Sequence, residues 1–141
     1  MVLTESKVEK HIRNYLIKRG WKITNAPRTA GTHGPDITAW RPRWNKRYII
    51  EAKGKSTRHS NQTVHNAFWA VLGQILTRMD IGGNHPNKAR FYGIGIPKSW
   101  EKAFRNKIHK MKFGWALLKL KVFLVDDEGN VQEKPYSYFL K

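Results

Sequence analysis

The spacing of apolar residues predicts a helix at the start of the chain, followed by three short strands. Within residues 4–19 apolar side chains recur every three or four positions, which is the repeat of an amphipathic helix, and Gly20 is placed to end it. Segments with alternating or β-branched residues follow at 21–26, 35–40 and 47–52. A polar loop at 27–34 and a basic hairpin turn at 41–46 separate these predicted strands.

The second half of the chain alternates helical and strand patterns. Residues 64–79 are apolar nearly all round, which predicts a buried helix, and 82–84 (Gly-Gly-Asn) close it. We then expect a central strand at 89–96, an amphipathic helix at 99–111 capped by Gly114, and a strand at 115–125. A turn at 128–130 leads to a last strand ending near Phe139. This order predicts one α/β (α+β) domain over residues 1–141, with a central mixed sheet flanked by helices and a C-terminal β-hairpin.

The charge of the chain indicates a polyanionic partner. There are 27 Lys and Arg residues against 10 Asp and Glu, a net charge of +17. Nucleic acid is the expected partner, because each phosphate contact made by Lys or Arg releases condensed counterions. An anionic membrane surface is the rival interpretation, but the basic residues are spread along the whole chain and no apolar run reaches about 18 residues.

Two further features concern location and redox chemistry. The N-terminus lacks the charged-then-apolar layout of a signal peptide, so we expect a cytoplasmic, DNA-associated protein without membrane contact. Cysteine is absent, which excludes disulfides and thiolate zinc sites.

Acidic residues are scarce before residue 126, and three of the charged positions suggest a metal site. Asp36 lies at the start of the predicted strand 35–40, and Glu51 and Lys53 lie at the end of the next strand, where period-two alternation puts them on one face. Antiparallel pairing would bring Asp36 beside them. Two carboxylates and the backbone carbonyl of Ala52 would suit Mg²⁺, which polarises a phosphodiester and activates water. Lys53 would then orient or deprotonate that water.

A structural alternative exists for these residues. Asp36 could cap a turn after Pro35, while Glu51 and Lys53 could be neighbours on a solvated strand face. The apolar residues at 48–50 favour the functional interpretation, because they predict that Glu51 ends a buried strand, where an acid without a partner or metal is costly.

These residues resemble the signature of a known nuclease superfamily. Pro35-Asp36 followed by Glu51-Ala52-Lys53 is similar to the PD-(D/E)XK motif, and the predicted element order matches that superfamily's restriction-endonuclease-like αβββαβ core. The resemblance is closest to archaeal-type Holliday junction resolvases, through Glu9 ahead of Gly20-Trp21 and through the run 28–32 (Arg-Thr-Ala-Gly-Thr) that leads to Asp36. It covers roughly residues 5–55. It departs in a slightly longer hairpin and in Thr32, where Ser is common.

The resemblance implies an enzyme and a set of roles. The expected activity is Mg²⁺-dependent endonucleolytic cleavage of DNA, with Mn²⁺ able to substitute, by a homodimer that makes paired nicks in a four-way junction. Glu9 would join Asp36, Glu51 and Lys53 as a catalytic residue, and would join Asp36, Glu51 and Ala52 around the metal. A structural alternative for Glu9 is a capping box with Ser6 at the helix start.

Several residues are candidates for contact with DNA. They lie on the presumed flap, after the catalytic strand or on the second long helix: Arg28, Thr29, Thr32, His33, Lys55, Arg58 and Gln74. Gln74 could equally be a polar core residue, and it shares a helix face with Arg78, which stands where other branches of the superfamily often have Tyr. Trp69, Trp100 and Trp115 are expected in the core, whereas Trp40 and Trp44 could contact DNA or a second subunit.

Two other functions remain open. The chain could be a restriction-type or repair endonuclease of the same superfamily that acts on duplex DNA. It could also be a basic DNA-binding protein without catalytic activity, although the set of Asp36, Glu51 and Lys53 argues against this. For the homodimer, the apolar face of the predicted strand at 115–125 is the candidate interface.

Overall fold

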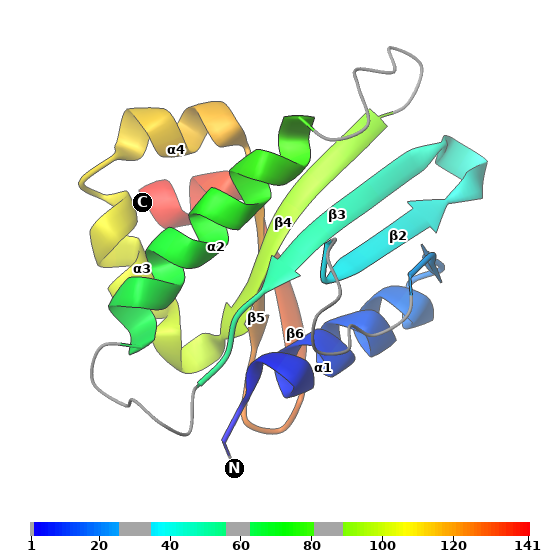
Figure 1. Ribbon diagram of the computed structural model, residues 1–141, viewed down its shortest axis with the longest axis horizontal. Coiled ribbons are helices and arrows are strands. Elements are labelled where there is room, and N and C mark those ends of the chain that lie inside the picture. Colours follow the sequence, from blue (N-terminus) through cyan, green and yellow to red (C-terminus); the bar gives the residue numbers. More distant parts are fainter. Residues whose placement is uncertain (1, 26–34, 56–62, 81–88) are drawn as a thin grey trace.

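The fold is a six-stranded mixed sheet with helices on both faces, and its strands follow one another in chain order (Figure 1). The computed structural model describes residues 2–25, 35–55, 63–80 and 89–141. The strands are β1 (Lys22–Ile23), β2 (Ile37–Arg41), β3 (Lys46–Ala52), β4 (Ala89–Pro97), β5 (Lys121–Val125) and β6 (Val131–Lys134). Strand pairs β3–β4 and β4–β5 are parallel, and the other three are antiparallel.

The helices are α1 (Glu5–Lys18), α2 (Thr63–Asp80), α3 (Glu101–Ile108) and α4 (Lys112–Leu118). Short 3-10 turns are present at Pro42–Trp44, Lys98–Trp100 and Tyr136–Leu140. The order of the first six helices and strands is α1, β1, β2, β3, α2 and β4, which confirms the predicted αβββαβ arrangement, and β5 and β6 form the expected C-terminal hairpin. No helix within the described ranges has the length and apolar character needed to span a membrane.

Helix α1 covers one face of the sheet with its apolar stripe. Val8, Ile12 and Leu16 are fully buried and belong to a cluster that includes Tyr48 and Ile50 of β3. The helix begins after Thr4, whose side chain accepts a hydrogen bond from the Lys7 amide (3.4 Å). The capping box suggested for Ser6 and Glu9 is therefore wrong, because Ser6 already lies inside the helix.

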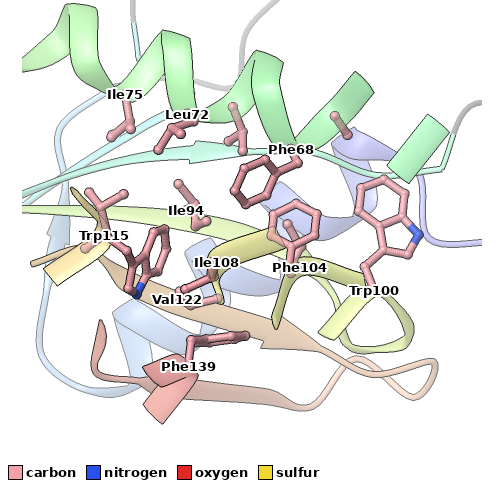
Figure 2. Close-up of a cluster of buried hydrophobic side chains, with 14 of the residues drawn as sticks. Phe68, Leu72, Ile75, Ile94, Trp100, Phe104, Ile108, Trp115, Val122 and Phe139 are labelled. Carbon is pink, nitrogen blue, oxygen red and sulfur yellow. The ribbon is translucent and has the colours of Figure 1, made fainter. Parts of the chain in front are cut away.

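Helix α2 covers the opposite face together with α3 and α4. Figure 2 shows Phe68, Leu72 and Ile75 of α2 above Ile94 and a group of large side chains: Phe104, Ile108, Trp115, Val122 and Phe139. Trp100 and Trp115 are in the core as expected. Trp69 and Leu76, however, are 52% and 42% exposed, so α2 is buried along one face and not all round, and the expectation for Trp69 was wrong.

The structure corrects the prediction for residues 99–125. The predicted single helix is a 3-10 turn followed by α3, and Gly114, expected as a cap, lies inside the separate helix α4. The chain leaves α4 through Lys119 in the left-handed region (φ 52°), so strand β5 is confined to Lys121–Val125. Its apolar residues from 122 to 125 are fully buried within this chain, which removes the basis for a dimer interface on a 115–125 strand. The last strand is β6, followed by a 3-10 turn in place of strand up to Phe139.

Candidate active site

Asp36 and Glu51 are brought side by side by the pairing of β2 with β3. The antiparallel register pairs Ile37 with Ile50, so that Asp36 lies across from Glu51 where the two strands begin and end. Both side chains are buried, and Glu51 has no exposed surface. The Ala52 amide donates a 2.8 Å hydrogen bond to Asp36 Oδ2, which fixes this carboxylate against the end of β3. Two acidic groups are thus held together in the interior.

Glu51 lies in an environment that disfavours its negative charge. Burial raises its pKa, the nearby Asp36 carboxyl raises it further, and the hydrogen bond from Arg78 counteracts this only in part, which leaves a pKa of about 7. Arg78 Nε donates to Glu51 Oε1 over 2.8 Å. Within the described ranges, the buried Glu51 Oε2 atom receives no hydrogen bond from an N–H or O–H donor. One carboxylate oxygen therefore lacks the partner that a buried polar atom ordinarily has.

Glu9 approaches the same place from α1. Its Oε1 accepts hydrogen bonds from Arg13 Nε (3.1 Å) and Nη2 (3.0 Å), one helical turn further along. Burial raises the pKa of Glu9, Arg13 lowers it, and the charges of Asp36 and Glu5 raise it again. The negative charge of Asp36 therefore acts on both Glu9 and Glu51, which places the three carboxylates within electrostatic range of one another.

Arg13 and Asn25 hold the backbone that carries Asp36, and sequence analysis did not identify either of them. Arg13 donates to the carbonyl oxygens of Asp36 (Nη2, 2.6 Å) and Asn25 (Nη1, 2.8 Å). The Asn25 side chain donates to the carbonyl oxygens of Pro35 (3.0 Å) and Asp36 (3.1 Å) and accepts from the Thr38 amide (2.8 Å). Three elements, α1, the end of β1 and the start of β2, are joined at this point.

Lys53 reaches toward the start of α1. Strand β3 ends at Ala52, and the next amide, that of Lys53, donates a 2.9 Å hydrogen bond to the Gly95 carbonyl of β4. The Lys53 Nζ lies 3.3 Å from Glu5 Oε1. Gly54 packs directly on the backbone there, since a Cβ at this position would overlap Thr4 and Glu5. The Lys55 amide donates to the Leu3 carbonyl (2.7 Å). The segment after β3 is therefore attached to the helix that carries Glu9.

Gln74 and Arg78 come from the same face of α2. Arg78 contacts Glu51, as described, while Gln74 lies one turn earlier and is partly buried. The part of the chain that the structure describes provides no hydrogen-bond partner for its buried Oε1 atom. Arg28, Thr29, Thr32, His33 and Arg58 lie outside the described residues, so these proposed DNA contacts stay predictions. The signal for Arg13 and Arg78 in the sequence was their i, i+4 spacing from Glu9 and Gln74.

The acidic groups have the chemistry of a Mg²⁺ site. Mg²⁺ binds through one or two protein carboxylates and keeps several waters, so Asp36 and Glu51, with an unsatisfied Oε2, fit its requirements. Among the described residues there is no group of three or more Asp, Glu, His or Cys side chains already arranged to hold an ion. Beside Glu9 a cavity of about 570 Å³ opens along α1 and is lined by polar and basic residues that include Lys10, Arg13 and Asn25.

Comparison with known proteins identifies the fold. No family model and no curated protein sequence matches the chain. An XisH family protein from Nostoc punctiforme is similar in structure, with a TM-score of 0.59 and 22% identity over 91% of this chain and 98% of that one. An FdxN element excision controlling factor protein from Anabaena variabilis has a TM-score of 0.55 and 20% identity over 89% and 95%. The chain therefore shares the fold of these proteins, a mixed six-stranded sheet flanked by helices.

Proposed function

We propose that the chain is a metal-dependent endonuclease that cuts DNA at the site formed by Glu9, Asp36, Glu51 and Lys53. The observation that carries the proposal is the buried pair of Asp36 and Glu51, in which one oxygen of Glu51 has no hydrogen-bond donor. Adjacent buried carboxylates repel each other and resist ionisation unless a cation compensates them. In a chain with a net charge of +17, two acidic residues held together in the interior indicate a functional role for that pair.

The proposed metal ligands are the carboxylates of Asp36 and Glu51 and the carbonyl of Ala52, with Glu9 directly or through water. Mg²⁺ bound there would polarise the scissile phosphodiester and lower the pKa of a water molecule, and Mn²⁺ should substitute. Glu9 is already oriented by Arg13, and Asp36 by the Ala52 amide. These contacts hold the oxygens in place before a substrate arrives, which reduces the reorganisation needed for the reaction.

Lys53 is the proposed cationic group of the chemical step. In the free protein its ammonium is paired with Glu5, a partly exposed residue, so this contact can exchange for a phosphate oxygen at small cost. The ammonium would then orient the attacking water and stabilise the negative charge that develops on the phosphate.

The proposed substrate is branched DNA, with a four-way junction as the specific candidate. The resemblance of Glu9, residues 28–32 and Glu51-Ala52-Lys53 to junction resolvases supports this choice. One structural neighbour is named as a factor that controls excision of an element, which agrees with a role in DNA excision or recombination. Paired cuts across a symmetric junction would need two active sites, so the proposed active form is a homodimer. A restriction-type enzyme acting on duplex DNA is the alternative.

A second candidate function is DNA binding without cleavage. The ion pairs Glu9–Arg13 and Glu51–Arg78 favour it, because they provide positive charge to two of the three site carboxylates without any metal. In this case the acids and arginines would be a structural network, and the basic surface alone would be functional.

Cleavage assays separate these functions. Wild-type protein is incubated with labelled four-way junctions, linear duplexes and flaps, and with a supercoiled cruciform plasmid, with and without Mg²⁺ or Mn²⁺. Asp36→Asn tests for a contaminating nuclease, and Asp127→Asn, which changes an exposed turn residue, is the matched control. Paired symmetric nicks at the junction that require Asp36 are the expected result. Cleavage at a fixed duplex sequence would indicate the restriction-type enzyme, and binding without metal-dependent cleavage would overturn the proposal in favour of the second function.

A further inference from the structure

We propose that the tip of the β2–β3 hairpin is a second DNA-binding site, which takes one nucleotide of a DNA strand with its base on Trp44 and its phosphate at Arg43. This inference rests on the proposed function only in taking DNA as the ligand. The tip is the turn at the opposite end of the hairpin from the C-terminal end of β3, where Glu51 lies (Figure 1). A hollow of about 370 Å³ is present there, lined by Gly20, Arg41, Pro42, Arg43 and Trp44.

Trp44 is exposed yet held in a defined orientation. Half of its surface (52%) is accessible. The Arg41 guanidinium lies 4.6 Å from the centroid of the indole, and the Lys46 ammonium lies 5.5 Å from it. The backbone is fixed by the 3-10 turn Pro42–Trp44 and by Asn45 in the left-handed region (φ 49°). A single exposed aromatic residue is ordinary, but one that is held in place by cation–π contacts and keeps half of its surface accessible is suited to binding a flat ring.

Arg41 connects the tip to the rest of the molecule. Its guanidinium also lies 5.1 Å from the Trp21 ring, so that it contacts two indoles, and it donates a hydrogen bond to the Arg19 carbonyl. Gly20, with φ of +88°, allows the chain to pass close to it. Arg41 is therefore a wall of the hollow and is not the group available to a ligand.

Arg43 supplies the available charge. It is exposed and makes no ion pair or hydrogen bond with any part of the chain that the structure describes. The sequence contains no acidic residue from 10 to 35 or from 37 to 50. Two further basic residues lie close by, since the Arg19 carbonyl accepts from Arg41 and Lys22 of β1 pairs with Trp40 of β2. A ligand that matches this site carries both a flat ring and a negative charge. A nucleotide has both, and base stacking on an aromatic side chain beside basic residues is the usual mode of single-strand binding.

The distance to the candidate active site fits a continuous strand. Asp36 and Arg41 are separated by five residues of extended chain, which span about 17 Å at ~3.3 Å per residue. A DNA strand rises about 3.4 Å per nucleotide, so the tip would contact a nucleotide about five positions from the phosphate at Asp36. The second site would therefore bind the same strand that the first site cuts.

Binding measurements with matched tryptophan variants test this inference. Fluorescein-labelled (dT)₁₀ and a 12-base-pair duplex are titrated with full-length protein carrying Asp36→Asn, without metal. Trp44→Ala should weaken (dT)₁₀ binding about tenfold, within the range measured for loss of one base stack, and Trp44→Phe should restore most of it. Trp69→Ala is the control, because Trp69 has the same 52% exposure but lies on α2. Arg43→Ala should reduce the slope of log K against log salt concentration by about one released ion. Lys110→Ala, which removes a distant exposed cation, should lower affinity for (dT)₁₀ and for the duplex alike.

Equal losses for Trp44→Ala and Trp69→Ala would overturn the inference, as would a Trp44→Ala effect confined to self-association in sedimentation experiments. The outcome is independent of catalysis. If Trp44→Ala loses strand affinity while wild-type protein cuts nothing, the tip binds DNA and the endonuclease proposal fails. If wild-type protein cuts junctions and Trp44→Ala binds and cuts normally, the endonuclease proposal holds and the tip inference fails.

Discussion

Replacing Glu51 by Gln should stabilise the protein at alkaline pH, although it removes a proposed catalytic group. The pKa of Glu51 is about 7 in the folded protein against an ordinary value of 4.5, chiefly because of burial. Between these values the folded protein holds a proton that the unfolded chain releases, so the free energy of unfolding falls as pH rises from about 4.5 to about 7. At about 1.36 kcal/mol for each pH unit, this amounts to roughly 3 kcal/mol above pH 7.

The measurement is a pair of urea unfolding series from pH 4 to pH 8.5, for wild-type protein and Glu51→Gln. The amide resembles the protonated acid in size and charge, so the two proteins should have similar stability near pH 4.5, and the variant should be about 3 kcal/mol more stable at pH 8. Acidic groups far from Glu51 make the same contribution in both proteins and cancel in the difference. Mg²⁺ should stabilise wild-type protein at pH 8 and leave the variant unchanged.

A difference in stability that does not vary with pH would refute this reasoning, because it would mean that Glu51 ionises normally in the folded state. A variant that is less stable at pH 8 would show that the ion pair with Arg78 outweighs the cost of burial. Asp127→Asn, an exposed change of the same kind, controls for the loss of one negative charge.

Three other predictions follow from the contacts around the site. Gly54→Ala should lower the free energy of unfolding by about 2 to 3 kcal/mol in thermal or urea unfolding, because its Cβ would overlap the start of α1. Gly73→Ala, in open space on α2, should raise it by about 0.5 to 1 kcal/mol. Equal effects of the two substitutions would contradict the role of close packing at Gly54. Arg78→Met should lower the free energy of unfolding by about 3 kcal/mol at pH 8, and adding Glu51→Gln should restore most of this loss. Additive effects of the two substitutions in a double-mutant cycle would argue against coupling between Arg78 and Glu51. Lys53→Met should slow cleavage by about two to four orders of magnitude with little change in DNA affinity, and a parallel fall in affinity would make it a binding residue.

The sequence predicted the elements whose period is distinctive. The apolar repeat predicted α1, and the alternating residues at 35–40 with the β-favouring residues at 48–50 predicted two strands whose pairing brings Asp36 beside Glu51, as the register shows. The prediction of one strand over residues 115–125 was wrong, because over so few residues an apolar alternation fits both a strand and a short helix. In the structure Trp115 is buried while Phe113 and Leu117 are 80% and 66% exposed, a pattern that follows from how α4 packs and not from local preference.

The network around the carboxylates was harder to predict than the carboxylates themselves. Acids are rare in this chain, so Asp36 and Glu51 were conspicuous, whereas Arg13 and Arg78 are two among 27 basic residues. Asn25 stands in a segment that reads as an ordinary strand end, and its hydrogen bonds to the backbone at 35–38 depend on a tertiary contact. Partners that come from distant segments leave no periodic signal in the sequence.

The ends of the sheet influence how copies of this protein can associate. The two end strands, β1 and β6, are only two and four residues long, and each carries a lysine, Lys22 and Lys134. Short, charged edge strands offer little unpaired backbone to a second sheet, and this arrangement opposes edge-to-edge aggregation. The five-residue strand β5, whose apolar residues from 122 to 125 are buried, is enclosed between β4 and β6. Concentrated preparations should therefore resist β-type aggregation, and an assembly of two copies would have to form through side-chain surfaces instead of a continuous sheet.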